Sequence, residues 1–221
     1  MAKSAVLKSS IARKVTMALS GLFLIVFLAQ HFFINSLSVF GPDAFNEVSH
    51  FMGYNPLVQY IVQPILIFAV VFHFIMGFVL DFQNRSSRPI AYAKYNGAVS
   101  ASWASRNMII SGSVVLAFIA LHLYDFWFPE MVYKYVDASP LEATRYYPEL
   151  VHKFVSPVRT GLYCLSFVLL ALHLWHGFNS SFQSVGFNNK YSKSLHTLGY
   201  AFAIVVPVGF IFIALFHHFN H

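Results

Sequence analysis

The chain is poor in both cysteine and charge. Its 221 residues include one cysteine, Cys164, and only 10% of them are charged, whereas a soluble globular protein carries roughly a quarter. A single cysteine excludes an intrachain disulfide, and it excludes a metal cluster held by several thiolates of this chain. The sequence also has no glycine-rich dinucleotide-binding fingerprint. Any chemistry must therefore rest on other residue types.

What the sequence has instead is long apolar blocks, and hydrophobic residues make up 57% of it. Each block exceeds the roughly 20 residues that a helix needs to cross about 30 Å of hydrocarbon. Because lipid offers no hydrogen-bond partner to the backbone, such blocks must be helical. The sequence predicts an all-α integral membrane protein, a single domain over residues 1–221 built as a bundle of five transmembrane helices. The expected ranges are 15–40, 57–82, 103–128, 155–182 and 195–219.

Two prolines and the distribution of charge add detail to this bundle. Pro64 and Pro207 fall inside the second and fifth blocks, where we expect local kinks. Ten Lys and Arg residues lie on the side of the N-terminus and four on the other side. The positive-inside rule therefore places the N-terminus in the cytoplasm and the C-terminus outside. The net charge of +6 is then a topology signal, and we do not expect nucleic-acid binding.

Each of the first four predicted helices carries histidine within its apolar block. A polar ring in hydrocarbon is costly and usually marks a functional site. One such histidine would equally well join two helices by hydrogen bonding, but four successive helices favour a shared function. The residues are His31, His73, His122 and, on the fourth helix, His173 and His176. The other histidines, among them His50, His152, His196, His217 and His218, are expected to be solvated or interfacial.

Counting residues from the helix ends places these histidines at two depths. With a rise of about 1.5 Å per residue, His31 and His122 lie roughly 25 Å above the inner boundary. By the same count His73 and His173 lie roughly 12 to 15 Å above it, and the two levels differ by on the order of 10 Å after allowing for tilt. A haem iron with two histidine ligands takes one from each face of the porphyrin. The depths therefore predict two b-type haems, one for each level. His173 and His176 project from the same side of a helix, so only one of them is a ligand.

Two serines share a spacing to the outer histidines. Ser20 stands eleven residues before His31, and Ser111 eleven before His122. At about 100° per residue each serine shares a face with its histidine, about 16 Å lower. A hydroxyl there would leave room for a macrocycle or bond a propionate, although packing of small residues explains the spacing equally well. Arg159, fourteen residues before His173, would reach the outer level, to serve a propionate or to snorkel to the interface.

The ordered histidines resemble those of a known family, the membrane-anchor cytochrome b subunits of succinate:quinone oxidoreductases and quinol:fumarate reductases. The type that fits is the single polypeptide with five helices and two haems, over essentially the whole chain. The resemblance implies the ligand pairs His31/His122 and His73/His173, and it leaves His176 as a haem-pocket or propionate group. It is carried by the S-G-x9-H run that ends at His31 and continues H-F-F-I-N-S, by the lone His73 and His122, and by the H-x3-G of His173 and Gly177.

The resemblance also implies partners and a reaction. A flavoprotein subunit and an iron–sulfur subunit would dock on the cytoplasmic face, in the cytoplasmic membrane of a prokaryote. This multi-pass chain would then relay electrons between the iron–sulfur subunit and a membrane quinone, with menaquinone expected for the family. It would be a subunit of an oxidoreductase that does not itself bind the dicarboxylate. The quinone needs groups that exchange protons, and the candidates near the outer haem are Glu47, His50 and Asp125, each of which is equally explained as a plain interfacial group.

Two other functions remain open on the sequence. One is the cytochrome b anchor of another quinone-linked dehydrogenase or of a hydrogenase, which would usually space its histidines differently. The other is a proton or metal-ion transporter whose histidines line a pathway. A transporter would need carboxylates inside the membrane, whereas Asp81 and Asp125 fall at predicted helix ends.

Overall fold

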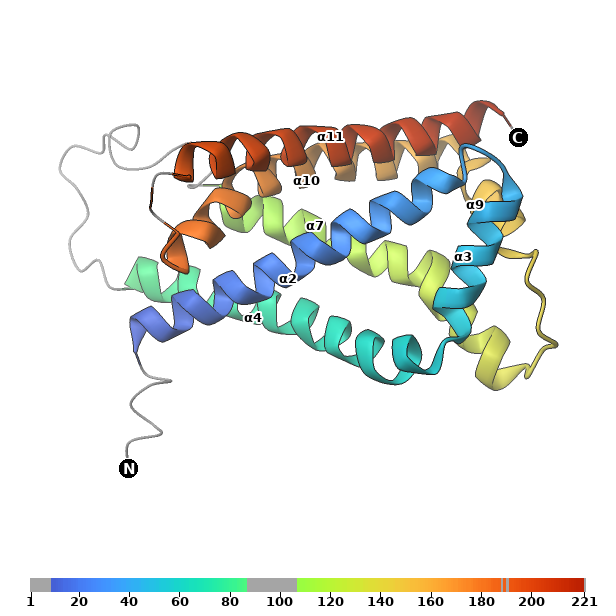
Figure 1. Ribbon diagram of the computed structural model, residues 1–221, viewed down its shortest axis with the longest axis horizontal. Helices are drawn as coiled ribbons and strands as arrows, with labels where there is room; N and C mark the ends of the chain where they lie inside the picture. The colour runs from blue at the N-terminus through green and yellow to red at the C-terminus, as the bar shows by residue number, and fades with distance from the viewer. Residues whose placement is uncertain (1–8, 87–106, 188, 190, 221) are drawn as a thin grey trace.

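The computed structural model describes residues 9–86, 107–187, 189 and 191–220. Five helical spans in this part of the chain are long and apolar enough to cross a membrane, and no strand occurs among the described residues. Successive spans run in opposite directions, so that α2 begins at the end of the bundle opposite to the end where α11 finishes (Figure 1). The predicted fold class is confirmed. The spans are Ser10–Leu37 (α2), Val58–Ser86 (η1 and α4), Met108–Val136 (α7 to η3), Pro157–Ser184 (α10) and Ser192–Phe219 (α11).

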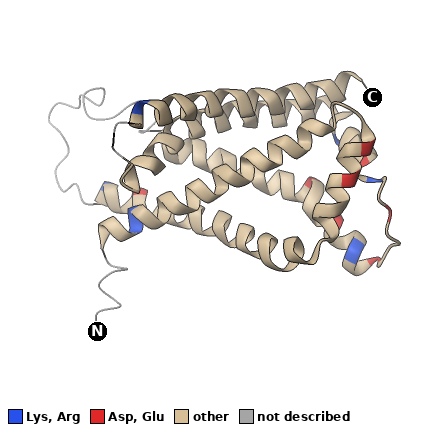
Figure 2. Cartoon of the chain, in the orientation of Figure 1, with Lys and Arg blue, Asp and Glu red and all other residues tan. Residues whose placement is uncertain are grey.

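Charge separates the two ends of the bundle. Every acidic residue of the chain except Asp81 belongs to the end that carries the short helices α3 (Pro42–Tyr54) and α9 (Tyr146–Phe154). We call this the acidic end (Figure 2). The opposite end carries Arg13, Lys14, Arg85 and Lys193 among the described residues. Six of the ten cations on the side of the N-terminus lie outside the described residues, so the orientation stays a prediction.

Helix α10 lies at the centre of the bundle, packed against α2, α7 and α11. The apolar core is concentrated toward the acidic end, where Tyr163 and Phe167 of α10 meet Phe210 and Ile213 of α11. Glycine lets the helices approach closely there. A Cβ atom on Gly209 of α11 would overlap the ring of Phe32 on α2, so this position favours a residue without a side chain.

Two of the spans contain π-helical turns directly before a proline. Proline has no N–H to donate to the preceding helical turn, and a wider turn redistributes the bonds around the gap. Gln63 N bonds to Val58 O within η1 (Val58–Val62), just before Pro64. The distortion expected at Pro64 thus takes the form of a π-helical turn, whereas α11 continues as a helix through Pro207.

The third span departs from its expected range of 103–128. Residues 103–106 lie outside the described residues, and helix α7 (Met108–His122) begins after them. The helix then continues through η2 (Leu123–Trp127), α8 (Phe128–Met131) and η3 (Val132–Val136). It continues because the π-helical turn η2 accommodates Pro129, and because the polar residues beyond this proline pack against α3. A hydropathy pattern cannot predict such tertiary contacts.

Candidate haem sites

The structure brings the four intramembrane histidines together in two pairs, each from two different helices. The outer pair, nearer the acidic end, is His31 of α2 and His122 of α7, with ring centroids 5.6 Å apart. The inner pair is His73 of α4 and His173 of α10, with ring centroids 6.4 Å apart. These are the partners that the depth count assigned to each other.

The separations fit a metal held between two imidazoles. With a metal–nitrogen bond of about 2 Å, two rings on opposite sides of one metal have centroids roughly 6 Å apart. Among the described residues no group of three or more His, Cys, Asp or Glu side chains could hold a metal ion. One ligand on each side of a flat group fits a cofactor that brings its own equatorial ligands, as a porphyrin does. The donor set therefore suits two bis-histidine haems.

The distance between the pairs follows from a contact in α2. Ser20 Oγ lies 3.1 Å from His73 Nδ1, so Ser20 marks the level of the inner pair. Eleven residues of helix separate Ser20 from His31 of the outer pair, which corresponds to about 16 Å. This exceeds the difference on the order of 10 Å expected from the helix ends. The 16 Å is a length along the axis of α2, whereas the expected value is a difference in depth after allowance for tilt.

The two predicted serines lie beside the inner pair. Ser20 Oγ donates to Met17 O at 2.7 Å while it lies next to His73. Ser111 Oγ likewise donates to Met108 O at 3.0 Å, and it lies 3.4 Å from His173 Nδ1. Each serine is thus held by its own helix and faces a histidine of the neighbouring helix.

The glycine that follows each serine leaves space for the same imidazole. A Cβ atom on Gly21 would lie 3.4 Å from His73 Cε1, and one on Gly112 would lie 3.5 Å from His173 Cε1. Gly177, in contrast, faces the methyl group of Met108, at 3.3 Å from the position of its missing Cβ. The Ser-Gly steps on α2 and α7 therefore form one wall of the inner site.

Aromatic rings surround the outer pair. Phe27 stacks on His31 with ring centroids 5.4 Å apart, and Phe210 of α11 lies at 5.9 Å from the same imidazole. The Asn35 amide nitrogen lies 3.4 Å from His31 Nε2. His122 contacts Phe118, Phe126 and Tyr163. Its Nδ1 is buried and has no hydrogen-bond partner among the described residues.

A buried ion pair lies next to the outer pair. The side chain of Asp125 is fully buried, and it accepts hydrogen bonds from the Arg159 guanidinium and, at 2.9 Å, from the Tyr163 hydroxyl. Asp125 belongs to the π-helical turn η2, one turn beyond His122. Pairing of this kind is what a charge inside a membrane requires. Arg159, predicted to serve a propionate or to snorkel, is thus held by a carboxylate.

A cavity of about 450 Å³ connects this ion pair with the acidic end. Asp125, Phe126 and Pro129 line it from one side, and Glu149, His152 and Lys153 of α9 line it from the other. Titratable side chains therefore extend from the exposed α9 to a carboxylate beside the outer pair.

The other predicted site residues lie in different surroundings. Glu47 is exposed on α3. His50, also on α3, packs on Tyr54 and Tyr146, with ring centroids 4.8 Å and 6.3 Å away, and its buried Nδ1 has no hydrogen-bond partner among the described residues. His176 is half-buried on α10, one turn beyond His173. The three quinone-site candidates thus do not share one environment.

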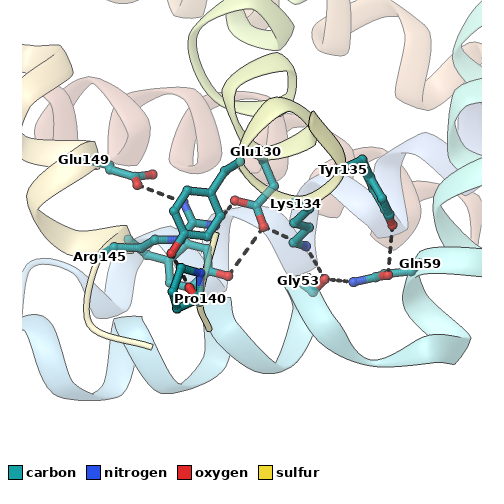
Figure 3. Close-up of polar contacts among 10 residues, drawn as sticks. Gly53, Gln59, Glu130, Lys134, Tyr135, Pro140, Arg145 and Glu149 are labelled. Atoms are coloured by element: carbon teal, nitrogen blue, oxygen red, sulfur yellow. Dashed lines mark hydrogen bonds and ion pairs between the residues drawn. The ribbon is translucent and has the colours of Figure 1, made fainter. Parts of the chain in front are cut away.

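A polar cluster at the acidic end was not foreseen from the sequence (Figure 3). Glu130 binds Lys134 at 2.6 Å and also binds Arg145, whose other nitrogen binds Glu149 at 2.8 Å. Lys134 donates to Gly53 O of α3. Burial opposes the charge on Arg145, yet its hydrogen bonds to Glu130 and Glu149 raise its pKa. The cluster therefore joins α3, α8, η3 and the start of α9 through charged side chains.

Two more residues were missed. His217 was expected at the interface, but it is buried and its Nε2 lies 2.8 Å from Ser38 Oγ. Tyr163 bonds to Asp125 and packs on His122. A signal for the polar cluster existed in the i,i+4 spacings of Glu130/Lys134 and Arg145/Glu149, whereas nothing local points to the contacts of His217 and Tyr163.

Comparison with known proteins gives one distant relative. The chain is 22% identical over 153 residues to the succinate dehydrogenase cytochrome b558 subunit of Bacillus subtilis strain 168, an alignment that covers 69% of this chain and 68% of that protein. No protein-family model and no solved structure matches the chain. The similarity supports the family to which the order of the histidines pointed.

Proposed function

We propose that this chain is the membrane-anchor cytochrome b subunit of a succinate dehydrogenase or fumarate reductase complex. It relays electrons between an iron–sulfur subunit and a membrane quinone through two b haems. The observation that carries this proposal is the pairing of four histidines from four helices, with ring centroids 5.6 Å and 6.4 Å apart. The distant similarity to the named Bacillus subtilis subunit supports the choice of complex.

His31 and His122 would hold the outer haem, and His73 and His173 the inner one. When bound, each haem would supply a one-electron carrier between its two histidines. The protein sets the environment of that carrier through burial, ligand hydrogen bonds and nearby charge. Here the inner imidazoles are held by serines, while phenylalanines keep water away from the outer ones.

We place the quinone reaction near the acidic end, beside the outer pair. Reduction of one quinone takes two electrons and two protons, and its reversal releases them. Asp125 is supported as the proton-exchanging group because it lies next to the outer pair and lines a cavity shared with Glu149 and His152. Glu47, exposed on α3, has less support as the proton-exchanging group. His50 would exchange protons with the quinone only if the quinone bound beside Tyr54 and Tyr146, on which His50 packs.

The partners would then bind at the other end of the bundle. An iron–sulfur subunit, with a flavoprotein subunit beyond it, would dock where α2 begins and α4 ends, near the inner pair. The ten Lys and Arg residues on the side of the N-terminus, against four on the other side, support this orientation in the cytoplasmic membrane of a prokaryote, with the N-terminus inside.

The test is a redox-titrated visible spectrum of the purified chain with haem quantification, repeated for His73→Ala and His122→Ala. We expect two low-spin b haems per chain, with the inner one lost in the first variant and the outer one in the second. A colourless protein would overturn the proposal in favour of a histidine-lined transporter. Haem together with hydrogenase activity, and no succinate- or fumarate-linked activity of the complex, would replace the succinate assignment by the other cytochrome anchor.

A further inference from the structure

The inner site is built from one sequence pattern that occurs twice. The spacing M-x2-S-G-x9-H appears on α2 and again on α7. In each copy the histidine belongs to the outer pair, while the serine and glycine face an inner histidine on the next span. The two copies are Met17, Ser20, Gly21, His31 and Met108, Ser111, Gly112, His122.

The serine hydroxyls determine which way the hydrogen bonds run. A hydroxyl has one proton to donate, and a carbonyl oxygen can only accept. Ser20 donates its proton to Met17 O at 2.7 Å. In the 3.1 Å contact between Ser20 Oγ and His73 Nδ1, the serine oxygen is then free to accept from the imidazole N–H, which is the arrangement that uses both contacts of the hydroxyl.

The same assignment of hydrogen-bond protons applies to the second copy of the pattern. Ser111 donates to Met108 O at 3.0 Å, which leaves its oxygen free to accept from His173 Nδ1 at 3.4 Å. A neutral imidazole carries one proton. With that proton on Nδ1, the Nε2 of His73 and of His173 keeps a free lone pair, which is the form that binds a metal.

We propose that Ser20 and Ser111 are positioning residues that hold both inner histidines in the tautomer with Nε2 free and increase their donor strength. This inference rests on the proposed haem-binding function. A hydrogen bond accepted from the far nitrogen of a histidine ligand raises its basicity and so favours the oxidised metal. The serines therefore lower the midpoint potential of the inner haem relative to a site without them.

The outer pair serves as an internal reference. His122 Nδ1 has no partner among the described residues, and His31 has only the amide of Asn35 at 3.4 Å from its Nε2. Neither outer histidine contacts Ser20 or Ser111. Each serine lies about 16 Å along its helix from the histidine of the same copy. Removing a serine should therefore change one haem and leave the other as it is.

The experiment is a spectroscopic redox titration with EPR of the full chain in detergent, comparing Ser20→Ala, Ser111→Ala and the double variant with wild type. For each single variant we expect about a tenfold rise in the ratio of reduced to oxidised inner haem at a fixed potential, which corresponds to about 59 mV for a one-electron couple. The shifts should add in the double variant. The outer haem should keep its potential and EPR signal.

Ser113→Ala is the matched control, because Ser113 is exposed on α7 and donates to Ile109 O at 2.8 Å without facing a histidine. It should shift neither haem, and Ser20→Thr should restore the wild-type potential by keeping a hydroxyl. Selective loss of the inner haem in the double variant would also support the inference.

Two haems of unchanged potential in the double variant would overturn it, and so would equal shifts of both haems. Wild-type protein that binds no haem would instead overturn the proposed function, so the two failures are distinguishable.

Discussion

The two histidine pairs are built in different ways although their ring separations are similar. The inner pair is held by hydroxyls, since Ser20 Oγ and Ser111 Oγ each lie within 3.4 Å of an imidazole Nδ1. The outer pair is held by aromatic packing and lies beside the buried charges of Asp125 and Arg159. The two sites therefore respond to different changes. Hydrogen bonding to the ligands tunes the inner haem, while burial and an adjacent ion pair tune the outer one.

The largest expected effect is the loss of one haem while the other stays bound. His31→Ala should remove the outer haem, because one of its two axial ligands is lost, and should leave the inner haem in place. Haem quantification would then give half the wild-type content, with the remaining haem at the inner potential. Retention of both haems would show that His31 is not a ligand.

The next largest effect is expected from Asp125→Ala. This change leaves the Arg159 guanidinium without its carboxylate, and we expect the free energy of unfolding to fall by about 3 kcal/mol, the low end for a buried pair because the Arg159 side chain is 31% exposed. Thermal unfolding followed by circular dichroism measures the loss. The potential of the outer haem should shift as well. An equal shift at both haems would contradict the separation of the two sites.

Glu130→Gln tests a region that touches neither pair. The change weakens the bonds of Lys134 and Arg145 to Glu130, and we expect a loss of about 2 kcal/mol in the free energy of unfolding. Both haem spectra and potentials should stay at their wild-type values. If either haem responds, the polar cluster at the acidic end is coupled to the sites.

The smallest effect concerns the two copies of the Ser-Gly step. A Cβ atom on Gly21 would lie 3.1 Å from Ser181 Oγ, whereas the nearest neighbour of one on Gly112 would be at 3.5 Å, an ordinary contact. Because both changes gain the same helix propensity, Gly21→Ala should leave the protein about 1 kcal/mol less stable than Gly112→Ala, and it should disturb the inner haem spectrum more. The reverse order would show that the space beside Gly112 is tighter than the space beside Gly21.

Much of the fold was predictable because hydropathy reports directly on transfer into lipid. Five spans and the all-α class follow from block length and composition. The end of the third span did not, since η2 and η3 carry that helix to Val136. A π-helical turn before Pro129 and packing against α3 are properties of the folded bundle.

The sequence by itself determined that four helices each carry an intramembrane histidine. It also determined which histidines share a depth and form a pair, because the rise per residue is a constant of the helix. It also determined the position of each serine relative to the histidine on the same helix. The tertiary structure alone decided that Ser20 faces His73 and Ser111 faces His173. It likewise decided that Arg159 pairs with Asp125 and that His217 is buried against Ser38. Such contacts depend on the rotation and tilt of one helix against another, which the periodicity of a single helix does not encode.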